Sequence, residues 1–254
     1  MKGNNKGLRD TKKRFLSLFE PLAQSARRLY PGWRIRIYHN VTEADAEAFA
    51  TLCQLYCEYE FVDLCDTRQL PGVGDLNTKL PNGRVWRFQV LGDPTVAMFA
   101  CRDSDSYISE REAAAVQEWM ESGKQWHIMR DLPTQRATIL AGMWGGHNYA
   151  DMALATQLRS ALLNNVPHTL WRGLDQKLLH TKLWPIIKEN AMIHDSYHCE
   201  NKAKYGDMVP FPTKRQGFTY VGCGPTREYV SKCVSKYKCP VACRPKVHKD
   251  WEYC

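Results

Sequence analysis

The fold class of this chain is decided by residues 95–106, which have the sequence TVAMFACRDSDS. The first part, Thr95 to Cys101, is apolar or small throughout, and a run of this kind predicts a buried β-strand. The strand ends abruptly at a charged cluster that contains Asp103 and Asp105. Because open α/β sheets bind their ligands at the carboxyl ends of strands, this junction is the first candidate site.

Helical and extended patterns alternate on both sides of this strand. Apolar residues recur at helical spacing in several segments, and Ser109 and Glu112 have the spacing of a capping box. Helices are predicted at 11–30, 43–57, 85–92, 109–123 and 175–190, the last with a kink at Pro185, and strands at 33–38, 60–62, 95–101, 126–129, 139–143 and 191–194. This alternation predicts an α/β fold up to about residue 195.

The composition is that of an ordinary globular protein. The 254 residues are 44% hydrophobic and 24% charged, which suits one large domain or two small ones. No apolar run approaches the roughly 18 to 20 residues that span a bilayer. The formal net charge of +8 favours an anionic ligand, such as a nucleotide diphosphate, a polyanionic glycan or nucleic acid, without choosing among them.

The ten cysteines fall into two groups, with none between Cys101 and Cys199. The later group crowds a basic, proline-containing tail, so we expect an irregular extension at residues 205–254, stapled by disulfides and packed on a domain of residues 1–204. Disulfides imply an oxidising compartment and hence a lumenal or secreted protein. Residues 1–11 lack the apolar core of a signal peptide, so a cytoplasmic location stays open if the chain truly starts at Met1.

The tail also offers a zinc-binding alternative. Cys239, Cys243, His248 and Cys254 approach the ligand pattern of a zinc knuckle, which would make the tail a nucleic-acid-binding module. Their spacings differ from those of known knuckles, and no Cys-x-x-Cys pair occurs in the sequence. Structural disulfides are therefore the first interpretation and zinc the second.

The Asp103-Ser104-Asp105 tripeptide has the chemistry of a cation site. Two carboxylates one residue apart at the end of a strand can converge on Mg²⁺ or Mn²⁺, hard cations that prefer oxygen ligands and share their coordination sphere with substrate phosphates. The alternative is an acidic pair on a solvated turn, and the tripeptide alone does not decide between them.

The order of several short motifs resembles glycosyltransferases of the GT-A type. No motif is specific alone, and the ordered set covers roughly residues 4–222. The set comprises the run 30–38, Arg84 and Arg87 before the strand ending at 102–106, the segments 126–131 and 142–146, Asp175-Gln176 at a helix start, and 194–196 after a short strand. The resemblance is to an animal-type group of nucleotide-sugar transferase-like proteins with an Asp-x-Asp motif.

The resemblance implies a GT-A-like, Rossmann-like mixed sheet flanked by helices. It also implies a divalent cation, Mn²⁺ or Mg²⁺, that neutralises the diphosphate leaving group of a nucleotide-sugar donor, with a UDP-sugar as the first choice. It assigns the cation to Asp103, Asp105 and His194. It assigns donor contacts to Arg84, Arg87, Asp103, Trp144, Gly145 and Gly146, and the reaction centre to Asp175, Gln176 and Asp195.

Each of these residue types also has a structural interpretation. His194 can be satisfied locally by Asp195, and Asp175 can supply a favourable negative charge at a helix start. Arginines commonly lie on solvated helix faces, and Trp144 beside two glycines can belong to the core. The spacing of the residues leaves both interpretations open.

By the same resemblance, a buried parallel strand should open the domain, whereas only a loop remnant at 2–5 precedes the first helix here. We therefore expect the first strand to be missing, which would expose a sheet edge. The predicted function is transfer of a sugar to a glycan or protein acceptor in the Golgi lumen or after secretion, without a nucleic-acid partner and with membrane contact only through a segment absent from this sequence. The alternative is a lumenal or extracellular binding protein that keeps the fold without catalysis.

Overall fold

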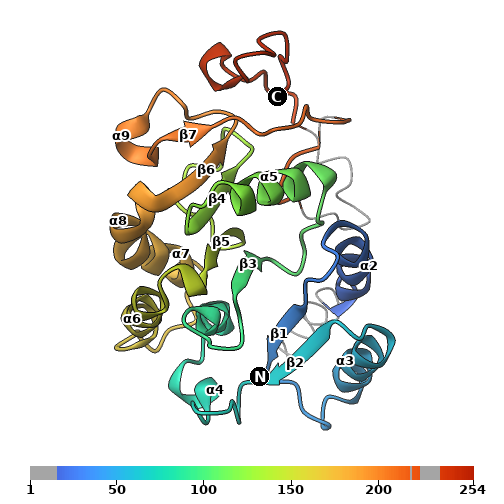
Figure 1. Cartoon of the computed structure of the whole chain (residues 1–254). Helices are drawn as coiled ribbons and strands as arrows, with labels where there is room; N and C mark the ends of the chain where they lie inside the picture. The colour runs from blue at the N-terminus through green and yellow to red at the C-terminus, as the bar shows by residue number, and fades with distance from the viewer. Residues whose placement is uncertain (1–15, 218, 224–234) are drawn as a thin grey trace, which may run out of the picture.

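The architecture is a mixed β-sheet with helices packed against it (Figure 1). The computed structural model describes residues 16–217, 219–223 and 235–254. The main sheet has the order β3-β5-β4-β6-β7, formed by β3 (Met98–Arg102), β5 (Met143–His147), β4 (Trp126–Arg130), β6 (Ala191–Asp195) and β7 (Met208–Val209). β5 is antiparallel to both of its neighbours, whereas β4, β6 and β7 are mutually parallel. The predicted α/β class with a mixed, helix-flanked sheet is confirmed.

A separate two-stranded parallel sheet contains β1 (Ile35–His39) and β2 (Val62–Asp66). Among the described strands, β1 pairs only with β2, and β3 pairs only with β5. A groove of about 330 Å³ between them is lined by residues of both β1 and β3, including Tyr38 and Ala100. The expected loop remnant at 2–5 lies outside the described residues, so the absence of a first strand stays a prediction.

The predicted helices are present with shifted ends. The longer ones are α2 (Phe19–Leu29), α3 (Ala46–Glu58), α5 (Glu110–Glu121) and α6 (Met152–Leu163), of which α6 was not expected. The short ones are α4 (Leu76–Lys79), η2 (Asn148–Ala150), α7 (Leu174–Leu178), η3 (Leu179–Leu183), α8 (Trp184–Ile187), η4 (Lys188–Asn190), α9 (Lys202–Tyr205) and η6 (Val241–Cys243). The helix predicted at 85–92 is a 3-10 helix, η1 (Gly83–Val90). The one predicted at 175–190 is divided by the π-helical segment η3 just before Pro185, which lacks the N–H of a regular turn.

Side chains of β4 alternate between two covered faces of the sheet. Trp126 and Ile128 belong to the main core, together with apolar residues of α6, α7, η3 and α8. His127 faces the opposite side, where it stacks on Trp119 of α5 with ring centroids 5.1 Å apart. All five residues of β4 are buried, as expected of a strand covered by helices on both faces.

Helix α5 begins at the predicted cap. The Ser109 hydroxyl accepts a hydrogen bond from the Glu112 backbone N–H at 3.2 Å. The Glu112 side chain does not complete the capping box, because it points inward, accepting a hydrogen bond from the Tyr30 hydroxyl at 3.1 Å and pairing with Arg102. Glu112 therefore ties α5 to α2 and β3.

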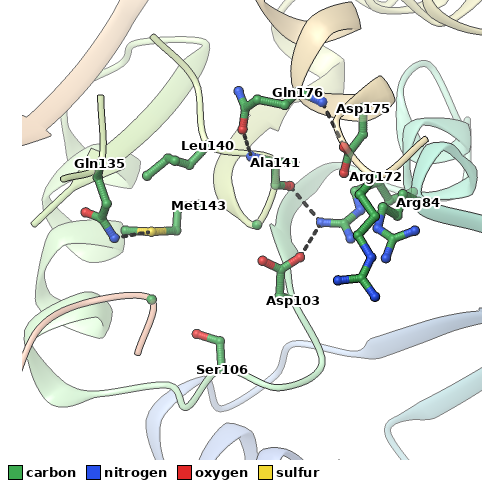
Figure 2. Close-up of a pocket in the computed structure, with 13 residues that line it drawn as sticks. Arg84, Asp103, Ser106, Gln135, Leu140, Ala141, Met143, Arg172, Asp175 and Gln176 are labelled. Atoms are coloured by element: carbon green, nitrogen blue, oxygen red, sulfur yellow. Dashed lines mark hydrogen bonds and ion pairs between the residues drawn. The ribbon is translucent and has the colours of Figure 1, made fainter. Parts of the chain in front are cut away.

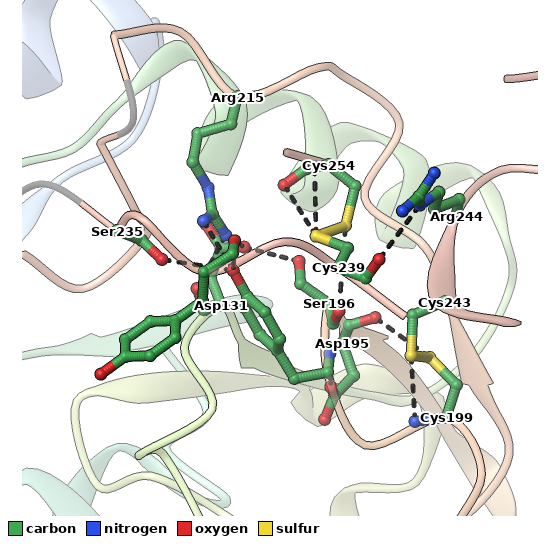
Figure 3. Close-up of a disulfide and its surroundings, with 12 residues drawn as sticks. Asp131, Asp195, Ser196, Cys199, Arg215, Ser235, Cys239, Cys243, Arg244 and Cys254 are labelled. Atoms are coloured by element: carbon green, nitrogen blue, oxygen red, sulfur yellow. Dashed lines mark hydrogen bonds and ion pairs between the residues drawn. A yellow bond between two sulfur atoms is a disulfide. The ribbon is translucent and has the colours of Figure 1, made fainter. Parts of the chain in front are cut away.

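The tail is held by disulfides, as the sequence predicted. Cys199 is bonded to Cys243 and Cys239 to Cys254 (Figure 3). Cys223 is also disulfide-bonded. All three cysteines of the zinc-knuckle alternative are therefore in disulfide bonds, so the described structure favours disulfides over a zinc site.

None of the described helices is long and apolar enough to cross a membrane.

Candidate functional site

A cavity of about 340 Å³ opens at the carboxyl end of β3 (Figure 2). Five residues named from the sequence line it: Arg84, Arg87, Asp103, Asp175 and Gln176. Further lining residues include Ser106, Gly142 and Met143, which lie in the motif segments 102–106 and 142–146 without having been assigned a role, and Gln135 and Arg172, which lie outside those segments. The carboxyl end of β3, which the sequence indicated as the first candidate site, is thus part of the wall of a cavity.

Asn82 positions the arginine-bearing segments around this cavity. It is almost completely buried just before η1, and its side-chain oxygen accepts a hydrogen bond from the backbone N–H of Arg84 at 3.2 Å. Its amide nitrogen donates to the carbonyls of Thr169 at 3.2 Å and Trp171 at 2.9 Å. One side chain therefore fixes both the start of η1 and the loop that carries Arg172.

Asp103 and Arg87 form an ion pair in the cavity wall. Their closest side-chain atoms, Oδ1 of Asp103 and one terminal guanidinium nitrogen of Arg87, are 2.8 Å apart. The same nitrogen donates to the carbonyl of Ala141 at 2.9 Å. Burial alone would lower the pKa of Arg87, but Asp103 and the other acidic groups around it, Asp175 among them, together outweigh this effect and the pKa is raised, so the guanidinium keeps its charge.

Asp175 is a buried carboxyl in the lining of the same cavity, at the start of α7. Only 5% of the residue is exposed, and this burial raises the pKa of Asp175 above its ordinary value. The backbone N–H of Gln176 donates to Asp175 at 2.8 Å, and this bond opposes part of the rise. A carboxyl in such surroundings can exchange a proton nearer to neutral pH than an exposed aspartate.

Gln176 acts on the loop before β5. Its side-chain oxygen accepts from the Ala141 N–H at 3.3 Å, and its amide nitrogen donates to the carbonyl of Ile139. These bonds use both ends of the side-chain amide, so Gln176 is a positioning residue for the part of the wall that also binds Arg87.

The cavity carries a positive balance of formal charge. Three arginines line it against two carboxyl groups, Asp103 and Asp175. Arg84 and Arg172 make no side-chain hydrogen bond or ion pair with any residue in the described ranges, and Figure 2 shows both side chains in the lining of the cavity. An anion that enters the cavity therefore meets two guanidinium groups that have no direct side-chain partner.

The predicted cation-binding set is not brought together. Asp105 is not among the residues that line the cavity. His194 is fully buried in β6, with Nδ1 2.9 Å from Nε2 of His127 and Nε2 3.0 Å from a carboxylate oxygen of Glu118. β6 lies three strand positions from β3, roughly 14 Å at about 4.8 Å per strand, which is too far for a shared cation.

This geometry shows whether the predicted ligand residues can bind a divalent cation. Across the described ranges, no three His, Cys, Asp or Glu side chains are grouped closely enough to hold a metal ion. Asp103 alone remains at the cavity, and its Oδ1 is paired with Arg87. The residues expected to bind Mn²⁺ or Mg²⁺ therefore do not fit that role in this structure.

Trp144, Gly145 and Gly146 lie in the core rather than at the cavity. They form the middle of β5, where the strand predicted at 139–143 was placed too early. Trp144 is 1% exposed and packs edge-to-face on Phe99, with ring centroids 5.3 Å apart. Adding a Cβ at Gly146 would put it 2.6 Å from the Trp126 ring. Gly146 makes room for aromatic packing between strands, Gly145 lies against the backbone of β3, and neither glycine lines the cavity.

Asp195 is also an internal anchor. It is fully buried at the end of β6, with a carboxylate oxygen 2.5 Å from Nε of Arg130 and 3.1 Å from Nδ1 of His198. Burial alone would raise its pKa, but the contacts with His198 and Arg130 lower it instead. Asp195 does not line the cavity and is not placed to act there.

Arg172 is the most informative residue that the sequence analysis missed. It lies in a loop without periodicity, three residues before Asp175, and its neighbours Leu170 and Trp171 are 71% and 55% exposed. The residues around Arg172 did not mark it as a site residue, because the exposure of Trp171 cannot be read from the sequence.

Comparisons with protein-family models, curated proteins and solved structures found no match to this chain.

Proposed function

We propose that this protein is a glycosyltransferase that takes a sugar from a nucleotide diphosphate donor, with a UDP-sugar as the first choice, and transfers it to a glycan or protein hydroxyl. The supporting observation is the joint lining of one cavity by three arginines and by the carboxyl groups of Asp103 and Asp175, at the end of a sheet strand. The ordered sequence motifs that resemble GT-A enzymes support the same assignment.

The arginines supply what the leaving group needs. As the bond between the anomeric carbon and the phosphate oxygen breaks, negative charge accumulates on the nucleotide diphosphate. Guanidinium groups bind phosphate oxygens through paired hydrogen bonds, and their charge opposes this build-up. The side chains of Arg84 and Arg172, which make no hydrogen bond or ion pair with any described residue, are the first candidates for these contacts.

Asp175 is the proposed proton acceptor. The acceptor oxygen forms a bond to the anomeric carbon, the donor phosphate departs with the bonding electron pair, and the hydroxyl proton passes to the Asp175 carboxylate. Because the pKa of Asp175 is raised by burial, transfer should decline with falling pH earlier than it would with an exposed aspartate as base.

Trp171 is a proposed contact for the acceptor sugar. The residue is 55% exposed, while its backbone carbonyl is held by Asn82 and the next residue lines the cavity. An exposed indole on a fixed backbone provides an apolar face on which a sugar ring can stack.

The test is release of UDP from a panel of UDP-sugars, followed with Asp175→Asn and with Lys177→Gln as the control. Lys177 is exposed on the same helix and does not line the cavity. We expect release by the wild type and by Lys177→Gln, and a loss of at least 100-fold in Asp175→Asn, which is the lower end of what a positioned general base contributes (about 10²). Equal rates in all three proteins would refute the role of Asp175.

A non-catalytic binding protein is the second candidate, and the dispersed cation ligands favour it. Donor binding by calorimetry without release of UDP from any sugar in the panel would support this second function and overturn the first.

A further inference from the structure

We infer that this cavity binds a diphosphate through the guanidinium groups of Arg84, Arg87 and Arg172 and does so without a divalent cation, an inference that rests on the proposed donor class. The sequence predicted that Mn²⁺ or Mg²⁺ would neutralise the diphosphate. In this inference the arginine side chains supply that positive charge instead.

The charge balance makes the cation unnecessary. Asp103 is already paired with Arg87, at 2.8 Å, so it offers a bound phosphate little net negative charge. Arg84 and Arg172 add two positive charges without a direct carboxylate partner among the described residues, and the Asp175 carboxyl, which interacts electrostatically with Arg84, offsets only part of them. Two guanidinium groups bring the same formal charge to a diphosphate as one Mn²⁺ ion, in a shape that matches phosphate oxygens.

The position of Arg87 also opposes a cation. A metal ion on Asp103 would have to lie close to the guanidinium that is bound to the same carboxylate, and the two positive charges would repel each other. Arg87 cannot easily move aside, because its guanidinium also donates to the Ala141 carbonyl at 2.9 Å. Ala141 is in turn held through its N–H by Gln176 at 3.3 Å.

The free arginines are carried by fixed backbone. Arg84 follows Asn82, whose side chain accepts from the Arg84 N–H and donates to the carbonyls on the Arg172 loop. Backbone that is held in place before the ligand arrives lowers the ordering cost of binding a diphosphate.

Substitution of Asp103 distinguishes cation-mediated binding from arginine-mediated binding, because the two predict opposite changes in the affinity for a diphosphate. If a cation on Asp103 holds the diphosphate, Asp103→Asn abolishes binding. If the arginines hold it, Asp103→Asn removes a negative charge from the cavity and leaves the charge of Arg87 without its carboxylate partner, so binding becomes tighter. Asp103 is half-exposed, and its replacement by the isosteric amide leaves the packing unchanged.

The experiment is calorimetric titration of the full chain with UDP and with inorganic pyrophosphate, in EDTA and in Mn²⁺. We expect Kd values for each probe that agree within about threefold between EDTA and Mn²⁺, and a several-fold tighter Kd for Asp103→Asn in EDTA. The double variant Arg84→Gln/Arg172→Gln should weaken binding by at least 100-fold, since each charged hydrogen bond contributes roughly tenfold or more. Arg136→Gln, an exposed arginine that does not line the cavity, should bind like the wild type.

Each outcome bears on a separate claim. The inference is overturned if binding appears only with Mn²⁺, if Asp103→Asn loses binding, or if the double arginine variant still binds. It is also overturned if neither UDP nor pyrophosphate binds. UDP release that requires Mn²⁺ overturns the inference and leaves the proposed transferase function standing. Tight, EDTA-resistant binding of pyrophosphate without binding or turnover of any UDP-sugar supports the inference and overturns the proposed function.

Discussion

Replacement of Asp131 by alanine should destabilise this protein more than the loss of an ion pair normally does. Asp131 follows β4 and is fully buried (Figure 3). Its carboxylate accepts two hydrogen bonds from Arg111, both at 3.0 Å, and one from Arg215 at 2.6 Å. The Ser196 hydroxyl at 2.6 Å and the Val221 N–H at 2.9 Å complete the set. The contacts join α5, β6 and the tail at one carboxylate.

The expected cost follows from what the substitution leaves behind. The side chains of Arg111 and Arg215 are 7% and 0% exposed, so Asp131→Ala leaves two guanidinium groups buried without their counter-ion. Breaking a buried ion pair by removing one partner costs about 3 to 5 kcal/mol. For a chain of this length each kcal/mol corresponds to about 2 to 4 °C, which gives a drop in Tm of about 6 to 20 °C.

The assay is thermal and urea unfolding of the wild type, of Asp131→Ala and of Asp63→Ala as control. Asp63 pairs with Arg34 at 2.6 Å, but the two side chains are 28% and 56% exposed, so its loss should cost about 1 kcal/mol or less. Equal destabilisation in the two variants would refute the argument that burial of the guanidinium groups sets the cost.

The pH dependence of stability gives a second measurement on the same residue. Burial alone would raise the pKa of Asp131, but Arg111 and Arg215 lower it below the unfolded value of about 3.9. The stabilisation is therefore fully present above about pH 4 and declines as pH falls through the lower, folded-state pKa. Asp131→Ala should flatten this acid limb of the stability curve, and an unchanged limb would contradict the assignment.

Three further predictions concern the tail, the histidine pair and β5. The double variant Cys239→Ser/Cys254→Ser should lose about 3 kcal/mol in urea unfolding, as expected for a closed loop of 15 residues, and the wild type with reductant added should lose more, because reduction also opens the Cys199–Cys243 bond and the disulfide of Cys223; an unchanged stability of the double variant would refute the prediction. Burial lowers the pKa values of His127 and His194, so stability should be complete above about pH 6.5 and decline below it, and His127→Gln should weaken that decline; a parallel pH profile would refute it. Gly146→Ala would force a methyl group against two aromatic rings and should cost about 1 to 3 kcal/mol in thermal unfolding, and an unchanged Tm would show that the glycine is not needed for packing.

The parts of the fold that were predictable are those with strong local patterns. The apolar run from Thr95 to Cys101 predicted β3, which the structure places at Met98–Arg102, and Ser109 capped α5 as its spacing indicated. The strand β5 was misplaced because its residues 143–147 contain two glycines, which have no strand propensity of their own. Their suitability depends on the rings of neighbouring strands and helices, which no local pattern reports.

The candidate site was predictable only where its residues lie near a recognisable element. Arg84 and Arg87 precede a marked strand, Asp103 ends it, and Asp175 begins a periodic helix, so each was named from the sequence. Arg172 has no such context and enters the cavity because Asn82, distant in sequence, holds its loop. Because a hydrogen bond from a distant residue fixes this loop, the position of Arg172 cannot be recognised from the residues next to it in the sequence.

The sequence by itself determined the alternating elements, the stapled tail and the presence of acidic and basic groups at the end of β3, because these depend on short-range periodicity and composition. Only the tertiary structure decided that Asp103 faces arginines while His194 and Asp195 face the interior. Strand order sets lateral separations and each strand's pleat sets the face of every side chain. Both are properties of pairings between residues far apart in the chain, and the chemistry of this cavity depends on them.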